Sequence, residues 1–273
     1  MKIQRIRVLV VIITAVFLAG SAVAQPARPP AVYYLPQAVK LDAITRKNFG
    51  SFYVRSYPGG PIQRLYTDGF YPIGWSRDGK FAYYSEPVDE ECGCYFAELT
   101  IIDLRTDKVL WEFENKPMER LNEKGEPIPD DMQKLWKRNE KVFFEKLHEH
   151  KIEQLARFSL LPATFRSAGK SYTAKVITTR GNDGDGLSRV RKLALDLSSP
   201  TLGKKTLYSA EYKGDDMYVS PLDIAVAGTF KSPFEDRVAV VMMKVQRGWE
   251  GPPHTVEAQI AGADLLSGFR KGK

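Results

Sequence analysis

Short runs of β-forming residues, each bounded by turn residues, recur along most of this 273-residue chain and constrain its fold more than any other feature. Pro58-Gly59-Gly60-Pro61, Arg77-Asp78-Gly79 and Arg105-Thr106-Asp107 are such turns. Asp-Gly between two β-type runs is typical of a hairpin, because both residues tolerate the positive φ of a tight turn. The pattern predicts antiparallel meanders. We expect strands at 51–57, 70–75, 80–85, 96–104, 109–113, 171–179, 190–197, 206–212, 218–227, 237–245 and 255–260.

The stretch 129–158 has a different pattern. After its start it contains no Gly or Pro, and its apolar residues recur at steps of three and four. Asp130 and Asp131 stand at its front, where a helix dipole favours negative charge. We expect one long helix, or two with a break near His150. The fold class is therefore α+β and mainly antiparallel β, with blade-like meanders that do not close into a propeller, which typically needs at least four blades.

The N-terminus has the three parts of an export signal. Three basic residues among the first seven precede an apolar run over 8–20, and Ala22-Val23-Ala24 supplies small residues where a signal peptidase reads. We expect cleavage between Ala24 and Gln25. The apolar run is shorter than the roughly 20 residues that cross a bilayer, so we expect a secreted or periplasmic product with no membrane span after cleavage.

Charge and composition exclude some classes of function. Hydrophobic residues make up 43% of the chain, which is enough to bury a core. The formal net charge is +7, and it falls to +4 without the three basic residues of the leader. This modest charge gives no reason to expect a nucleic-acid partner.

The chain divides into four parts in this interpretation. Residues 1–24 are the signal peptide, and the Pro-rich segment 25–48 is expected to be a leader or linker. Residues 49–267 form a single β-rich domain, with a helical insert at 116–160. Residues 268–273 are expected to be a frayed tail.

Two stretches within 73–111 resemble blade sequences. Residues 74–83 (GWSRDGKFAY) look like the strand-turn-strand signature of TolB-type propeller blades, and 101–111 (IIDLRTDKVLW) resemble the closing strand pair of quinoprotein-type blades. An export signal, this blade-like start and the late segment 247–253 (RGWEGPP) are together similar to a bacterial family of predicted secreted proteins of unknown function. These resemblances imply local structure and export, and they assign no catalytic residue.

The most distinctive local motif is Cys92-Gly93-Cys94, which follows an acidic loop. In an oxidising compartment the two thiols would form a small disulfide ring that stiffens the loop, and this is the interpretation we favour. A thiol-disulfide exchange centre and a metal site are the alternatives. The acidic neighbours raise the pKa of both thiols and so disfavour a reactive thiolate, and a metal site has only three histidines in the chain to complete it.

Asn182-Asp183-Gly184-Asp185-Gly186 is a candidate calcium loop. The oxygen atoms of Asn182, Asp183 and Asp185 could bind a hard cation, although the full EF-hand pattern is not met. The same residues are also common in an ordinary tight loop between strands. Apart from this calcium hypothesis, we expect no cofactor.

Aromatic residues are dense in the N-terminal β region. Tyr53, Tyr71, Trp75 and Tyr83 are candidates for an exposed face that binds a protein or glycan ligand, and core packing is the simpler alternative.

No catalytic signature selects an enzyme class. The chain has no Gly-x-Ser-x-Gly, no phosphate-binding loop and no His-Glu-x-x-His. We expect an exported, non-catalytic binding protein of unknown ligand. The alternatives are a hydrolase that uses paired carboxylates, whose separation is set only in three dimensions, and a thiol-disulfide role for Cys92 and Cys94.

Overall fold

Strands dominate the structure, a computed structural model, and they confirm the expected α+β class with mainly antiparallel sheets. None of the helices in the described part is both long and apolar enough for a membrane crossing. The structure describes residues 32–53, 60, 62, 65–88, 94–182, 187–213, 219–248 and 251–271.

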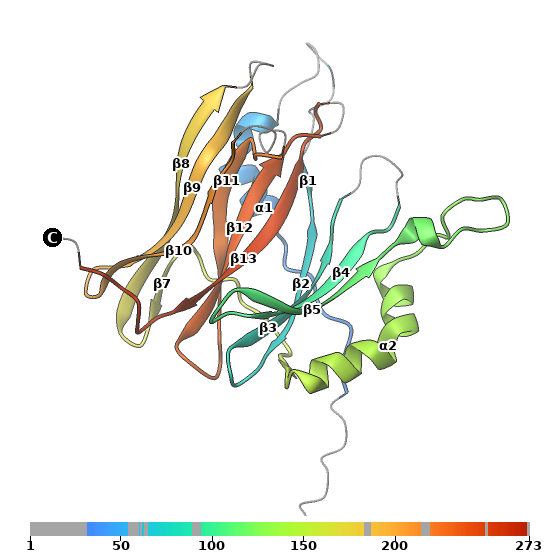
Figure 1. Ribbon diagram of the computed structural model, residues 1–273, viewed down its shortest axis with the longest axis horizontal. Coiled ribbons are helices and arrows are strands. Elements are labelled where there is room, and N and C mark those ends of the chain that lie inside the picture. Colours follow the sequence, from blue (N-terminus) through green and yellow to red (C-terminus); the bar gives the residue numbers. More distant parts are fainter. Residues whose placement is uncertain are drawn as a thin grey trace, which may run out of the picture. The chain divides into compact units, whose positions relative to one another are not determined.

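The described strands form three open sheets (Figure 1). The first sheet, in the order β5-β4-β3-β2-β6, contains β2 (Gly69–Trp75), β3 (Lys80–Glu86), β4 (Ala97–Asp103), β5 (Lys108–Asn115) and β6 (Glu153–Gln154). The second sheet, in the order β10-β9-β8-β7, contains β7 (Thr164–Ser167), β8 (Lys170–Asn182), β9 (Ser188–Ser199) and β10 (Gly203–Glu211). The third sheet, in the order β1-β13-β12-β11, contains β1 (Tyr66–Thr67), β11 (Asp223–Lys231), β12 (Arg237–Gln246) and β13 (Thr255–Asp264).

Each sheet is built around an antiparallel meander, as the turn signals predict. The four strands β2 to β5 pair in chain order, and so do β7 to β10 and β11 to β13. The third sheet is completed by β1, which comes from the N-terminal side and pairs parallel with β13. The meanders are therefore blade-like, and none of the three described sheets closes on itself.

Strand β12 is the centre of the packing. Its side chains alternate: Val241 and Met243 belong to the core shared with the first sheet, whereas Val240 and Met242 belong to the core shared with the second. All four are fully buried, which explains the nearly continuous apolar sequence of this strand. The third sheet thus lies between the other two, and helix α2 (Met132–Glu149) covers the remaining face of the first sheet.

Helix α2 is shorter than the stretch that predicted it. Leu135, Trp136, Phe143 and Leu147 bury its apolar side against the first sheet. The helix ends at Glu149 with His150 as its C-cap, and Lys151 then takes a left-handed conformation with a φ of 58°. The expected continuation to 158 is wrong, because the chain turns and forms β6, whose backbone pairs with the edge of β2.

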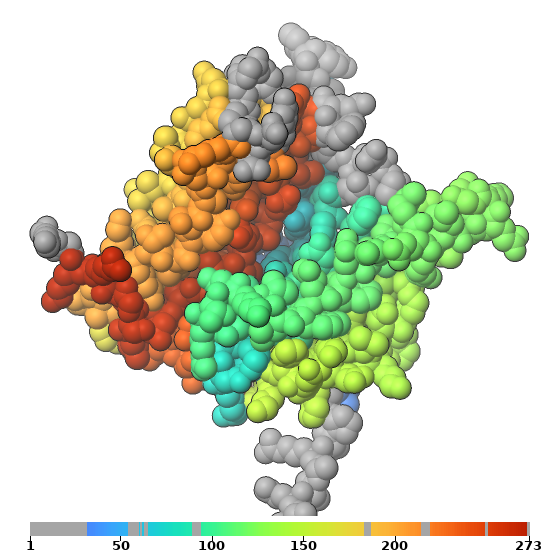
Figure 2. Space-filling model, in the orientation of Figure 1, coloured from blue at the N-terminus to red at the C-terminus, as the bar shows by residue number. Residues whose placement is uncertain are grey.

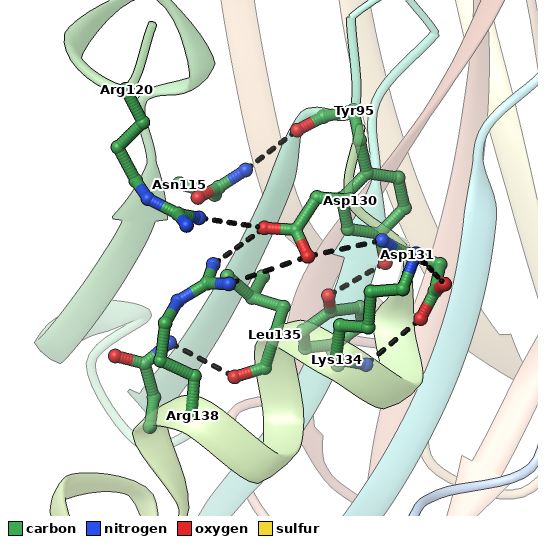
Figure 3. A network of polar contacts seen from close by, with 10 residues as sticks. Tyr95, Asn115, Arg120, Asp130, Asp131, Lys134, Leu135 and Arg138 are labelled. Carbon is green, nitrogen blue, oxygen red and sulfur yellow. Dashed lines mark hydrogen bonds and ion pairs between the residues drawn. The ribbon is translucent and has the colours of Figure 1, made fainter. Parts of the chain in front are cut away.

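Two aspartates fix the start of α2 (Figure 3). The Asp131 side chain accepts a hydrogen bond from the Lys134 backbone N–H at 2.8 Å and caps the helix. The Asp130 carboxylate is almost fully buried and lies between the guanidinium groups of Arg120, at 3.0 Å, and Arg138. The acidic front of the helix therefore has a structural role.

The segment after α2 joins two sheets. Residues 152–161 pair first with β2, where Gly74 opposes Gln154, and then with β11, where Thr229 pairs with Leu161. A Cβ atom at Gly74 would lie 2.3 Å from the Glu153 carbonyl oxygen, and one at Gly228 would lie 2.3 Å from the Leu161 carbonyl oxygen. Only glycine permits these two backbone approaches.

Both ends of the domain differ from expectation. In the segment 25–48, expected as a linker, Tyr33 and Leu41 are buried and a short helix, α1 (Asp42–Asn48), packs onto the core. The strand expected at 51–57 is wrong at its start, where Gly50–Phe52 is a 3-10 helix. In the tail expected to fray, Arg270 exchanges two backbone hydrogen bonds with Lys204.

Candidate functional site

The candidate site lies on the face of the first sheet that is turned toward the third sheet. Along β4, Leu99 and Ile101 join the core under α2, and Ile102 joins the core between the sheets. Because side chains alternate along a strand, Glu98 and Thr100 lie on the inter-sheet face.

Strand register arranges this face in two rows. In the first row Ser85, Glu98 and Glu114 lie side by side on β3, β4 and β5. The Ser85 hydroxyl donates to Glu98 at 3.5 Å. In the second row Tyr83 and Glu112 flank Thr100, whose hydroxyl donates to Glu112 at 3.5 Å. We call these six residues the acidic face.

The carboxylates of the acidic face have no ion-pair partner among the described residues. Glu98, Glu112 and Glu114 form no ion pair with any residue that the structure describes. Burial, with the charges of Glu112 and Glu114, raises the pKa of the Glu98 carboxyl above its usual range. Like charges directly opposite on neighbouring strands are destabilising, so the fold tolerates an unfavourable arrangement here.

Two buried carboxylates elsewhere in the protein are each paired with a cation. Asp130 lies 3.0 Å from Arg120, and the Asp196 carboxylate lies 3.0 Å from the Lys204 ammonium. The chain has 40 Lys and Arg residues against 33 Asp and Glu, so cations are abundant. Within the described ranges, the acidic face is a place where three carboxylates without such a partner lie on two adjacent strands.

Asp68 lies near the acidic face, just after β1. One carboxylate oxygen accepts the Val88 backbone N–H at 3.1 Å, and the carboxylate also accepts the Ala258 N–H from β13. This side chain therefore links the first and third sheets. Burial, reinforced by the negative charges of Glu257 and Glu98, raises the pKa of Asp68 to about 7.

The surface is hollowed next to this face. Figure 2 shows a recess between β13, drawn in red, and the teal and green strands β4 and β5. At one end of these strands the sheets approach closely: a Cβ atom on Gly262 would lie 2.1 Å from the Leu104 carbonyl oxygen.

The four aromatic candidates do not form one exposed face. Trp75 is fully buried, and Tyr83 stacks on Phe70 within the inter-sheet core at a centroid distance of 5.1 Å. Tyr71 lies on the opposite side of the first sheet and donates to Glu86. Tyr53 is partly buried under the guanidinium group of Arg46. Of the four, Tyr83 borders the carboxylates through its hydrogen bond with Thr100.

Two other candidates fall partly outside the described residues. The residues outside the described part are Asp183 and Asp185 of the calcium loop and Cys92 of the disulfide motif. The calcium and disulfide hypotheses therefore stay predictions. Asn182 is the last residue of β8, and the Cys94 sulfur lies 3.9 Å from the Met118 sulfur. The described residues contain no group of three or more His, Cys, Asp or Glu side chains placed to hold a metal ion.

The carboxylates of the acidic face were missed in the sequence, although a signal was present. The signal is an alternation of polar and apolar residues in two strand-like runs, which includes Glu98 next to Leu99 in the first and Glu112 next to Phe113 in the second. Only the strand register brings Glu98 and Glu114 together, and composition does not contain that information.

Comparisons with known proteins add no assignment. The chain matches no protein-family model, and no curated protein and no solved structure is significantly similar to it.

Proposed function

We propose that the protein is exported and works outside the cytoplasm as a non-catalytic binding protein, with the acidic face as its binding surface. The ligand is a cationic segment of a peptide or protein. The observation that carries this proposal is the juxtaposition of Glu98 and Glu114 on adjacent strands with no described cation paired to either. A bound cation would remove the repulsion that the free protein carries.

The geometry favours ammonium and guanidinium groups as the complementary chemistry. Glu112 and Glu114 lie on the edge strand β5 and are both open to solvent, and Glu98 lies beside Glu114 on the neighbouring strand β4. The hydroxyl groups of Ser85 and Thr100 are buried beside the carboxylates and donate to Glu98 and Glu112. An extended basic segment could place successive side chains along the two rows of the acidic face, with charge-assisted hydrogen bonds to the carboxylates.

A peptide-binding experiment tests the proposal. The probe is a fluorescein-labelled decapeptide of alternating Lys and Ser, and its anisotropy is measured at low ionic strength against the protein. We expect binding that weakens as salt is added. The variant Glu98→Gln/Glu114→Gln should bind at least tenfold more weakly.

The matched control is Glu123→Gln/Glu145→Gln, which removes the same two charges from exposed residues outside the acidic face. It should bind within about twofold of the wild type, because local charge and not net charge holds the peptide. Equal loss in both double variants, or no binding by the wild type, would reject the proposal.

Export is supported by the tripartite leader and by the resemblance to predicted secreted proteins. The test is expression of the full chain in a Gram-negative host, followed by fractionation and mass spectrometry of the N-terminus. We expect protein that begins at Gln25 in the periplasm or medium. Intact chain with Met1 in the cytoplasm would contradict export and leave the peptide-binding result unaffected.

A second candidate is a hydrolase that uses carboxylate chemistry. It is favoured by Asp68, because a carboxyl whose pKa is near 7 can transfer protons at neutral pH. Glu98 is close enough to affect that pKa. The test is hydrolysis of p-nitrophenyl glycosides, in which Asp68→Asn should lower kcat at least a hundredfold. A wild type without turnover would reject this candidate.

A further inference from the structure

A second polar site lies on the opposite side of the third sheet, where the C-terminal segment meets the second sheet. A pocket of about 490 Å³ is lined there by Lys204, Lys205, Thr206, Gly268, Arg270 and Lys271. Four of these six residues carry a positive charge and none carries a negative charge. The volume is in the range of small-molecule sites.

Backbone pairing places two of these cations side by side. The Lys204 N–H donates to the Arg270 carbonyl at 2.9 Å, and the Arg270 N–H donates to the Lys204 carbonyl at 2.8 Å. Lys204 and Arg270 are therefore a directly opposed antiparallel pair, in which like charges repel. Gly203 permits this approach, because a Cβ atom there would lie 2.2 Å from the Arg270 carbonyl oxygen.

The described contacts leave half of this positive charge unmatched. The Lys204 ammonium is paired with the Asp196 carboxylate at 3.0 Å. The Lys205 ammonium donates to the Asp264 carbonyl and, at 2.9 Å, to the Ser267 carbonyl. Arg270 and Lys271 are exposed and form no ion pair with a described residue.

Lys205 is held in place from several sides. Its ammonium lies 4.5 Å from the centre of the Phe269 ring, in addition to its two carbonyl contacts. Burial lowers the pKa of this ammonium. An anion in the pocket would stabilise its charged form, so the pocket contains one positioned cation and two unmatched ones.

We infer that this pocket binds an oxyanion, either free phosphate or the phosphate group of a small organic molecule. Arg270 supplies a planar guanidinium group that suits two phosphate oxygens, and Lys271 supplies a second charge. The pocket is larger than a phosphate ion, so the organic phosphate is the better fit. This site is independent of the acidic face and of the proposed peptide ligand.

Calorimetric titration at an ionic strength of about 20 mM tests the inference, because screening is weak there. The probes are inorganic phosphate and glucose 1-phosphate. The wild type should bind both, with tighter binding of glucose 1-phosphate. Equal affinities for the two would identify free phosphate as the ligand, and both results support an oxyanion site. The variant Arg270→Gln/Lys271→Gln should lose at least tenfold in affinity.

The control is Arg166→Gln/Lys124→Gln, which removes the same two charges from β7 and from the loop after β5. It should bind both probes within about twofold of the wild type. Circular dichroism establishes that each variant is folded. Equal weakening in the two double variants, unchanged affinity in Arg270→Gln/Lys271→Gln, or no binding of either probe by the wild type would overturn the inference.

Discussion

Glu98 and Glu114 lie directly opposite each other on the antiparallel strands β4 and β5, and no described residue forms an ion pair with either carboxylate. In the same sheet the arrangement of the other face is different. There the Glu86 carboxylate accepts hydrogen bonds from the hydroxyl groups of Tyr71 and Tyr95. The two faces of the first sheet therefore differ: the Glu86 carboxylate has hydroxyl partners within the protein, whereas Glu98 and Glu114 face each other without a described cation.

The opposed pair predicts a stabilising substitution. The pKa of Glu98 is raised in the folded state, so the folded protein favours the protonated, neutral side chain. The stability that this protonation provides is lost as pH rises through that pKa. Glu98→Gln should therefore raise the free energy of unfolding at pH 7 by about 0.5 kcal/mol and leave it unchanged near pH 3. Urea denaturation at the two pH values measures this. Glu112→Gln, which lies opposite Thr100, should have a smaller effect, and a destabilised Glu98→Gln at pH 7 would contradict the account.

Asp68 predicts a specific pH dependence. Its pKa is about 7 in the folded protein and about 4 in an unfolded chain, so the folded state binds the proton more tightly. The contribution of Asp68 to stability is fully present below pH 4 and should be lost as pH rises to 7 and beyond. Between pH 5 and pH 8 the wild type should lose on the order of 2 kcal/mol more than Asp68→Asn, measured by urea unfolding. Equal losses in the two proteins would exclude a raised pKa at Asp68.

The close backbone approaches predict two costly glycine substitutions. Gly74→Ala and Gly228→Ala should each lower the free energy of unfolding by more than about 2 kcal/mol, because carbonyl oxygens occupy the space of the new methyl group. Gly50→Ala is the control, since nothing lies within 4 Å of a Cβ atom there. Its effect should stay within about 0.5 kcal/mol. A tolerated Gly228→Ala would show that residues 152–161 do not join the sheets as described.

The ion pairs of Asp130 with Arg120 and Arg138 at the start of α2 predict that a buried carboxylate contributes more to stability than an exposed one. Asp130→Asn leaves Arg120 and Arg138 without their shared carboxylate, and it should cost about 2 kcal/mol in unfolding free energy. Glu140→Gln removes an exposed ion pair with Lys137 and should cost less than about 0.5 kcal/mol. Thermal unfolding of both variants compares the two losses of stability. Similar losses would show that the buried Asp130 ion pairs contribute no more than the exposed pair.

The sequence predicts elements whose residues repeat a pattern over several turns or pairs. Runs of β-forming residues bounded by turns predict β3 and β12, and the three- and four-residue steps of the apolar residues predict α2. Helix α1 has only seven residues, and β1 and β6 have two each, so no period can identify them. Their formation depends on contacts with distant parts of the chain.

Register and backbone chemistry explain the remaining differences. The strand expected at 218–227 is displaced to Asp223–Lys231, because Pro221 has no N–H for a ladder and its carbonyl accepts the Val190 N–H instead. The acidic face combines residues about 30 positions apart in the chain, and a shift of one residue in register would turn Glu98 to the other side. The site therefore could not be predicted before the pairing was known.

Amide chemical-shift mapping with the Lys-Ser decapeptide tests the central claim most directly, because it locates the ligand without relying on a substitution. The account predicts that the largest shift changes fall on Ser85, Glu98, Thr100, Glu112 and Glu114, and that they diminish when salt is added. Shift changes that are absent, or that gather on another surface while these five residues stay unaffected, would contradict it.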